Sequence, residues 1–367
     1  MAGNTASWRW RSPPGKFACV DPFEQMAAQG HGEVHVCFDP AAQLRAIIAI
    51  HDERLGPALG GTRCLPYANA EAGLTDALRL ARAMTFKAAL ARLPHGGGKA
   101  VILAPEGDFD RTRLFERFAR FVDGLGGRYI TTEDSGTSEA DMEVVRRRTR
   151  HVCGFSVASG GSGDPSPFTA LGVRRGMEAC VRIALGRESL AGVHVAVQGL
   201  GHVGFHLCRE LAQAGARLTV ADVVDELVDR VRDALPVQVV SPAEIHRTEC
   251  DVYAPCALGG ALNDRTVPEL RCRIVAGCAN NQLANPRNGE MLHARGILYA
   301  PDYAINAGGL INVAQEVQGY DETKARSRVL AIHDTVAEIC ARSRTLGLPP
   351  HQVADAMVAE ILATASR

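Results

Sequence analysis

The chain has 367 residues, of which 46% are hydrophobic and 22% charged, which is enough to bury cores in roughly two domains. Forty basic side chains stand against 41 acidic ones, so the formal net charge is −1. No global field therefore favours nucleic acid or an anionic membrane as a partner. The composition predicts an ordinary soluble protein.

Eleven cysteines are scattered along the chain without C-x-x-C pairs or the Cys/His spacing of a zinc site. This pattern favours reduced, buried thiols and no bound metal. The start of the chain contains no apolar run of signal-peptide length, and no stretch approaches ~18 uninterrupted apolar residues. We therefore expect a cytoplasmic protein in which residues 1 to about 15 form a loose extension.

The first half of the chain has a mixed α/β pattern. Two apolar runs around an Asp-Pro turn predict a hairpin over 33–53, and a stripe at helical spacing predicts a helix over 71–93. Lys87 lies three residues beyond Met84, near the inward face of that helix. The pattern then continues with a buried strand, a helix and a second strand, at 99–105, 111–125 and 128–134.

A segment rich in Gly, Ser and Pro at 156–167 interrupts this pattern and is interpreted as a hinge. Strands then alternate with helices, which predicts a doubly wound parallel sheet. The end of the chain is helical, with Pro349 and Pro350 at a helix start. The expected fold is thus α/β with two domains and a C-terminal helical segment. The predicted parts are a substrate and oligomerisation domain, a Rossmann-type domain, and helices that pack partly on the first domain: 1–155, 156–330 and 331–367.

A dinucleotide-binding fingerprint lies between the first predicted strand and helix of the second domain. Gly199, Gly201 and Gly204 form G-x-G-x-x-G, so backbone amides can approach a pyrophosphate at the positive end of a helix. Asp222 ends the next strand, where a carboxylate accepts the ribose hydroxyls and repels a 2′-phosphate. This spacing favours NAD over NADP. The cofactor-contacting loop also includes Leu200, His202 and Val203.

The stretch "LPHGGGKAVI" places three glycines before Lys99, but Ala100 follows, so a Walker-type loop with its hydroxyl is excluded. A lysine at a glycine-rich bend is poorly solvated, and desolvation favours the neutral, basic form of an amine. Glu133 and Asp134 end the following strand and offer a carboxylate partner. Residue types alone leave two readings open, a hydride-transfer site or surface lysines with Asp134 as a helix cap.

Several motifs in order resemble the glutamate/leucine/phenylalanine/valine dehydrogenase family, most closely its leucine dehydrogenase branch. The resemblance covers roughly residues 30 to 320. It is carried by "GPALGGTRCLPYANAEAGLTDALRLARAMTFKAALARLPHGGGKAVI", "YITTEDSGT", "GSGDPSPFTALGV", "VAVQGLGHVG", "CDVYAPCALGG", "AGCANNQL" and "YAPDYAINAGGLINV".

The resemblance implies NAD-dependent oxidative deamination of an amino acid by a homo-oligomer, a dimer to an octamer. It implies that Lys99 activates water, that Lys87 binds the substrate α-carboxylate, and that Asp134 shuttles a proton to the amine. It places backbone of the substrate floor at Gly60 and Gly61, and a substrate hydrogen bond at Asn306. It implies cofactor contacts at Thr169, Ala257 and Asn280.

The same resemblance bears on the side chain of the substrate. Glutamate enzymes of the family carry lysine and serine where this chain has Leu59 and Val313, and burying a carboxylate against these two would cost several kcal/mol. The remaining pocket candidates are Met84, Thr132 and Leu310. Leucine enzymes look smaller at the last two positions, whereas phenylalanine enzymes tend to carry leucine at the last. Branched-chain amino acids are therefore expected first and phenylalanine second.

A hypothesis of another class is a catalytically silent relative that binds NAD as a sensor. The complete set of Lys87, Lys99 and Asp134 argues against it, because a silent protein has no physical need for all three. A nucleic-acid role has no basic patch or aromatic platform to support it.

Overall fold

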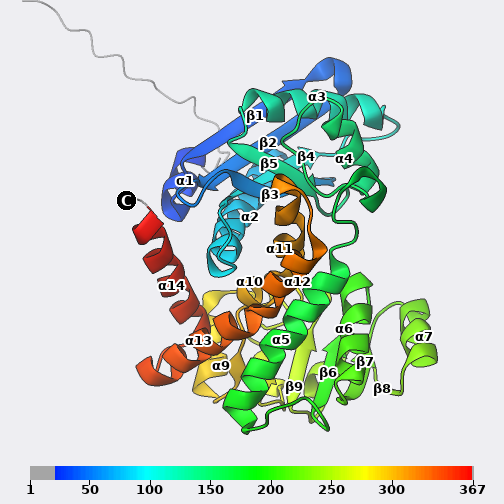
Figure 1. The fold of residues 1–367 in the computed structure, drawn as a ribbon, viewed down its shortest axis with the longest axis vertical. Helices are drawn as coiled ribbons and strands as arrows, with labels where there is room; N and C mark the ends of the chain where they lie inside the picture. The colour runs from blue at the N-terminus through cyan, green and yellow to red at the C-terminus, as the bar shows by residue number, and fades with distance from the viewer. Residues whose placement is uncertain (1–20, 366–367) are drawn as a thin grey trace, which may run out of the picture.

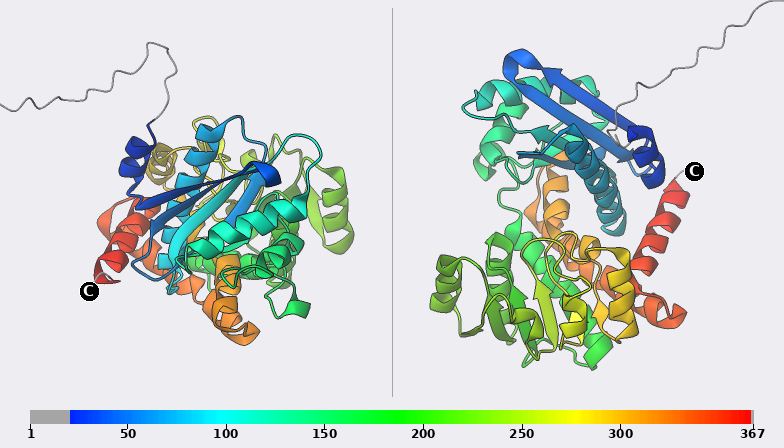
Figure 2. Two further views of the ribbon diagram at one scale, coloured as in Figure 1. Left: turned by 90° about the horizontal axis from the view of Figure 1, so that it is seen from above. Right: turned by 180° about the vertical axis from the view of Figure 1, so that it is seen from behind.

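The computed structural model describes residues 21–365, and its main bodies are two α/β domains stacked along the long axis of the molecule (Figure 1). The predicted extension at residues 1 to about 15 lies outside the described residues. Each domain is built on its own sheet, and the C-terminal helices run along both domains (Figure 2).

The first sheet is mixed and has the order β1-β2-β4-β3-β5. The predicted hairpin is confirmed, because β1 pairs antiparallel with β2 from Glu33 opposite Ile50 to Asp39 opposite Leu44. β4 pairs antiparallel with β2, while β3 is parallel to both β4 and β5. The strands are β1 (Glu33–Asp39), β2 (Leu44–Asp52), β3 (Ala58–Leu65), β4 (Gly96–Leu103) and β5 (Tyr129–Glu133).

Helices cover both faces of this sheet. Asn69 caps α2 by accepting from Ala72 N, and the apolar face of α2 packs on β2 and β4. Asp110 caps α3 in the same way, and α3 buries two phenylalanines against the other face. The helices are α1 (Pro22–Gln29), α2 (Ala70–Leu90), α3 (Arg111–Gly124) and α4 (Glu139–Arg146), with short 3₁₀ turns η1 (Pro40–Ala42) and η2 (Val157–Ser159).

The glycines before Lys99 form the start of β4 rather than a bend, so that part of the sequence interpretation is wrong. None of the three has a positive φ, and their need for glycine is steric. A Cβ at Gly97 would lie 2.1 Å from Thr85 N of α2, and a Cβ at Gly98 would lie 2.7 Å from the Tyr129 ring. The glycines therefore let α2 and the neighbouring strands approach β4 closely.

The second sheet is parallel throughout and has the order β8-β7-β6-β9-β10-β11. This is the 3-2-1-4-5-6 strand order of a Rossmann fold, so the predicted fold class is confirmed. The strands are β6 (His194–Gln198), β7 (Arg217–Ala221), β8 (Val237–Val239), β9 (Val252–Pro255), β10 (Ile274–Val275) and β11 (Leu298–Tyr299).

Both faces of this sheet are covered. Val195 and Val197 of β6 belong to the apolar cluster under α5 and α6, whereas Ala196 between them belongs to the cluster on the opposite face. The helices are α5 (Ser166–Leu185), α6 (His202–Gln213), α7 (Asp225–Ala234), α8 (Thr266–Glu269), α9 (Pro286–Ala294), α10 (Asp302–Ile305) and α11 (Gly308–Ala314), with η3 (Ile245–Arg247) and η4 (Gln315–Gln318).

The C-terminal helices connect the two domains. They are α12 (Glu322–Leu330), α13 (Ile332–Leu346) and α14 (Pro350–Ala365). Residues of α14 form one apolar cluster with Ala89 and Leu90 at the end of α2, so the last helix packs on the first domain. Figure 2 shows α14 extending from the second domain towards α1. The domain boundaries at 155/156 and 330/331 stay predictions.

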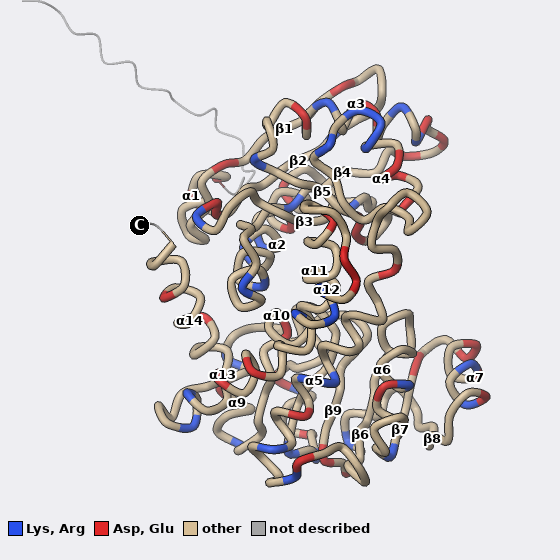
Figure 3. The backbone as a smooth tube through the Cα atoms, viewed as in Figure 1, with Lys and Arg blue, Asp and Glu red and all other residues tan. Residues whose placement is uncertain are grey.

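Charges of both signs are mixed along both domains (Figure 3). Within residues 21–365, no helix is long and apolar enough to cross a membrane.

The close contact of α2 with β4 predicts a stability effect. Gly97→Ala should lower the free energy of unfolding by about 1–3 kcal/mol or more, because the added methyl forces α2 away from β4. Thermal unfolding can be compared with that of Gly124→Ala, whose new Cβ meets nothing within 4 Å at the end of α3. Equal midpoints for the two variants would contradict the steric account.

Candidate active site

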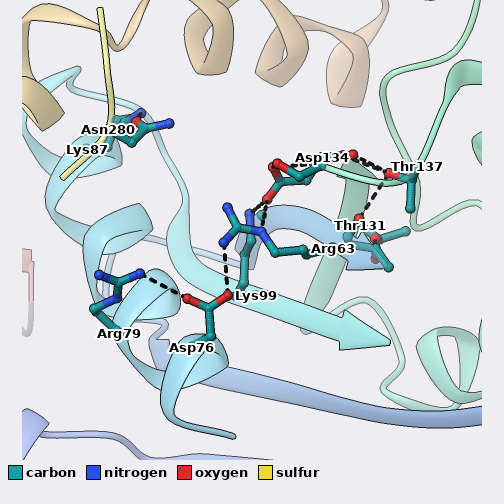
Figure 4. A network of polar contacts seen from close by, with 12 residues as sticks. Arg63, Asp76, Arg79, Lys87, Lys99, Thr131, Asp134, Thr137 and Asn280 are labelled. Atoms are coloured by element: carbon teal, nitrogen blue, oxygen red, sulfur yellow. Dashed lines mark hydrogen bonds and ion pairs between the residues drawn. The ribbon is translucent and has the colours of Figure 1, made fainter. Parts of the chain in front are cut away.

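Three neighbouring strands bring the two proposed catalytic side chains together. Lys99 on β4 is only 5% exposed, and Asp134 follows directly after β5. Lys99 Nζ donates to Asp134 Oδ2 (Figure 4). Thr137 holds the turn after β5, because its Oγ1 accepts from Asp134 N at 2.8 Å and donates to Thr62 O at 3.0 Å. The lysine and the carboxylate predicted from the sequence thus form one ion pair.

The alternative that Asp134 is a helix cap is wrong. Ser138 caps α4 and forms a capping box with Asp141. Of the two carboxylates at the end of β5, Asp134 is the one that contacts Lys99. Burial, followed by the charges of Glu139, Asp164 and Glu316, raises the pKa of Glu133 to about 7.

Arg63 is part of this site although the sequence interpretation missed it. Its Nε lies 3.6 Å from Asp134 Oδ2, and its Nη1 donates to Asp76 Oδ2 at 2.9 Å. Tyr67 OH also donates to Asp76 Oδ2, at 2.7 Å, which fixes the carboxylate that binds the Arg63 guanidinium. Strand alternation places Arg63 on the same face of β3 as Gly61, which is the signal that could have found it.

Two opposing effects act on Asp134. Burial alone would raise the pKa of this carboxyl, but the positive charges of Lys99 and Arg63 outweigh that effect. The hydrogen bond from Ser135 N to its Oδ1, 2.6 Å long, stabilises the same charge. The pKa of Asp134 is therefore held well below its usual range, which favours the ionised carboxylate.

A second group of polar side chains joins the two domains. Lys87 Nζ on α2 donates to Asn280 Oδ1 at 3.2 Å, and Asn306 Nδ2 donates to the same oxygen at 2.9 Å. Asn306 Nδ2 also donates to Cys278 O, at 3.0 Å. The other amide oxygen, Asn306 Oδ1, is buried and has no hydrogen-bond partner among the described residues. Such an acceptor is available to a donor of a bound molecule.

Lys87 itself has a perturbed ionisation. Burial is the largest effect and lowers the pKa of its ammonium to about 8, while Asp302 and Asp134 oppose the shift and Lys99 adds to it. Because the Lys99 and Asp134 charges act on Lys87, the two polar groups share one electrostatic environment.

The predicted substrate wall is apolar in the structure. Leu59 is 1% exposed on β3, and Val313 on α11 is also buried. Both belong to one apolar cluster against which Leu310 packs. Met84 lies beside Gly60, where a Cβ would be 3.4 Å from its Cγ. Thr132 is buried on β5, and its Oγ1 has no hydrogen-bond partner among the described residues.

The glycine fingerprint has the geometry that a dinucleotide needs. Gly199 adopts φ +103°, and a Cβ there would lie 2.6 Å from Ala257 N. A Cβ at Gly204 would lie 2.1 Å from Gly199 O, so this glycine allows α6 to approach β6. Gly201 meets nothing within 4 Å, and no side chain caps α6. The amides at the start of α6, including those of His202 and Val203, can therefore face a pyrophosphate.

The remaining cofactor candidates surround this loop. Asp222 Oδ2 accepts from Leu200 N at 2.6 Å and Oδ1 accepts from Val224 N at 3.0 Å, so the carboxylate also fixes the loop. Thr169 lies in the first turn of α5, where its Oγ1 would be 2.7 Å from a Cβ at Gly309. Thr169 thus lies beside the turn that carries Asn306.

Comparisons with known proteins agree with this arrangement. The family model described as "Glu/Leu/Phe/Val dehydrogenase, dimerisation domain" matches residues 32–151. The model described as "Glutamate/Leucine/Phenylalanine/Valine dehydrogenase" matches residues 222–361.

Whole-chain relatives cover almost the full length. The leucine dehydrogenase of Geobacillus stearothermophilus is 47% identical over 345 residues, 94% of each chain. The valine dehydrogenase of Streptomyces albus is 46% identical over 339 residues, 92% of this chain and 93% of that one. The crystal structure of L-tryptophan dehydrogenase from Nostoc punctiforme superposes with a TM-score of 0.83 at 44% identity, covering 94% of this chain and 99% of that one. These matches confirm the resemblance found in the sequence.

Proposed function

The chain belongs to the Glu/Leu/Phe/Val dehydrogenase family, and we propose that it oxidatively deaminates an apolar L-amino acid to the 2-oxo acid and ammonia, using NAD. The observation that carries this proposal is the Lys99–Asp134 ion pair, which shares its electrostatic environment with Lys87. Together with Lys87, this pair provides two ammonium groups and a carboxylate for a reaction in which protons move between water, amine and protein.

The geometry suggests a role for each side chain. Lys87 binds the α-carboxylate of the substrate, which then replaces Asn280 as its partner. The unpartnered Asn306 Oδ1 accepts an N–H of the substrate amine. Asp134 accepts a proton from that amine, and Lys99 in its neutral form activates the water that attacks the imine carbon. The nicotinamide cofactor supplies the hydride acceptor for the Cα–H bond.

The preference for NAD rests on Asp222. Its carboxylate lies at the end of β7, where it accepts ribose hydroxyls and disfavours a 2′-phosphate by charge repulsion. Arg217 begins the same strand, at the end remote from Asp222, so we assign it no role in binding a 2′-phosphate.

Substrate selection follows from the apolar wall. Leu59 and Val313 offer no donor to a side-chain carboxylate, so glutamate is a poor substrate. Leucine, valine and isoleucine are the favoured substrates. Phenylalanine is the second candidate, because Leu310 is the residue that phenylalanine enzymes tend to carry at this position.

The protein is further proposed to act in the cytoplasm as a homo-oligomer. The description of the first matching family model as a dimerisation domain supports assembly through residues 32–151.

A substrate panel tests the proposed function. With NAD, we expect NADH absorbance to increase fastest with leucine, valine or isoleucine, more slowly with phenylalanine or tryptophan, and barely with glutamate. Replacing NAD by NADP should abolish most of the rate. Tight NAD binding without turnover on any amino acid would instead support the silent sensor.

Substitution of each lysine separates their roles. Lys99→Ala should lower kcat by about 10²–10⁴, the scale for removing a positioned acid–base group, with NAD binding retained. Lys87→Ala should raise KM strongly as well, because a charge-assisted bond to the α-carboxylate is lost. Small primary amines should restore part of the rate of Lys99→Ala and much less of that of Asp134→Asn. Near wild-type turnover of Lys99→Ala would refute the catalytic assignment.

The pKa of Lys87 predicts a pH dependence. Its protonated form binds the carboxylate, so KM for the 2-oxo acid at saturating ammonia should rise as the pH increases through about 8. Beyond that value the rise should be about tenfold per pH unit. Lys87→Arg stays protonated and should show a flatter profile. The same rise in both proteins would assign the titration to another group.

A further inference from the structure

A cavity of ≈ 270 Å³ lies between α2, the start of α9, α10 and the start of α14. Its wall contains none of the residues assigned above to substrate or cofactor. Two arginines, Arg79 and Arg82, form part of this wall together with His351 and Asp355. Both domains contribute to this wall, since α2 belongs to the first domain and α9 and α10 to the second (Figure 1).

His351 in this wall is only 8% exposed, and neither of its ring nitrogens has a hydrogen-bond partner among residues 21–365. A neutral imidazole carries one N–H donor and one acceptor, and leaving both unpaired in a buried position is costly. The ring lies against α9, because a Cβ at Gly289 would be 2.4 Å from its Nδ1. Neither nitrogen has accessible surface in this position, so the ring would have to turn towards the cavity to offer its N–H to an occupant.

Arg82 is a second group with unused donors. Its guanidinium lies over the Phe86 ring at 4.1 Å from the centroid, and its closest charged partner is Asp355 Oδ2 at 4.0 Å. That distance exceeds a hydrogen bond, and the Asp355 carboxylate instead accepts from Tyr303 OH at its other oxygen. Within the described part of the chain, no hydrogen bond is made by the Arg82 side chain. Its planar fork of five N–H donors is therefore available.

Arg79 adds further donors. It uses Nη2 for Asp76 and has its remaining guanidinium donors free among the described residues. The carboxylates of Asp302 and Asp355 in the same wall balance the formal charges of the two arginines, and Asp302 also accepts from Gln282 N. The surplus in this cavity is therefore one of unused N–H donors, and the rings of Phe86, Tyr299 and Tyr303 form part of its wall.

We propose that this cavity binds a small organic carboxylate. The planar carboxylate pairs with the fork of Arg82, which moves further from Asp355, and the His351 N–H donates to the same ligand. The carbon chain lies against Phe86 and Tyr303, whose rings are in edge-to-face contact at 5.9 Å. The occupied cavity bridges α2 to α14 and so links the two domains at a place other than the catalytic cleft.

Calorimetric titration of the full chain with succinate, without nucleotide and at constant ionic strength, tests this proposal. Arg82→Gln and His351→Gln should each weaken succinate binding at least tenfold. Arg113→Gln, a change at an exposed arginine of α3, should leave it unchanged. Thermal unfolding of each variant verifies that it is folded. Arg82→Gln and His351→Gln change different helices, so a folding defect in one leaves the other as a test.

A control titration addresses the catalytic cleft, because Lys87 is itself proposed to hold a carboxylate. Lys87→Met should retain the Arg82-dependent binding. Succinate binding that disappears in Lys87→Met but persists in Arg82→Gln would overturn the proposal, as would equal affinities in all variants. Inorganic phosphate is the third arm. If it binds in an Arg82-dependent manner and succinate does not, the carboxylate assignment is wrong.

Discussion

The close contact between α2 and β4 is the constraint on which the rest of the site depends. Gly97 allows the backbone of β4 to approach Thr85 of α2 without a side chain between them. Lys87 on the helix and Lys99 on the strand are therefore near enough for the charge of Lys99 to lower the pKa of Lys87. Any larger residue at position 97 would separate Lys87 from the Lys99–Asp134 pair, and the proposed chemistry needs both at one substrate.

Contacts between the domains then extend this arrangement. Lys87 reaches Asn280, and Asn280 accepts from Asn306, so a residue of the first domain is bonded to a pair in the second. Between the two sheets, Glu316 accepts from Gly154 N and Ser162 N, at 2.9 and 2.7 Å, which holds this connecting segment to η4. Burial raises the pKa of that glutamate, so its ionised form depends on these amide bonds. The position of Asn280 and Asn306 relative to Lys99 is thus set by a small number of polar contacts.

The sequence predicted the parts of this design that rest on local pattern. The fingerprint glycines lie where strand, turn and helix were expected, and the expected carboxylate partner of Lys99 lies directly after β5. The glycines before Lys99 were wrongly interpreted as a bend, because a flexible bend and close packing both favour glycine. The contacts with Thr85 and Tyr129, which the sequence does not show, identify close packing as the reason. β3 was missed for a related reason, since two glycines near its centre weaken a strand pattern. Because Arg63 lies on β3, its place in the site was not predicted either.

The low pKa of Asp134 bears on how a carboxylate in this position can take a proton. While Lys99 is charged, Asp134 is stabilised as an anion and is a weak base. Once Lys99 has given its proton to solvent or product, one of the two charges that lower this pKa is removed and the carboxylate becomes more basic. The proton is therefore best assigned to the pair as a whole, with Arg63 limiting how basic Asp134 becomes. Asp76 binds Arg63, and Tyr67 binds Asp76. These two residues would therefore influence the proton transfer indirectly, because they keep the Arg63 guanidinium beside Asp134.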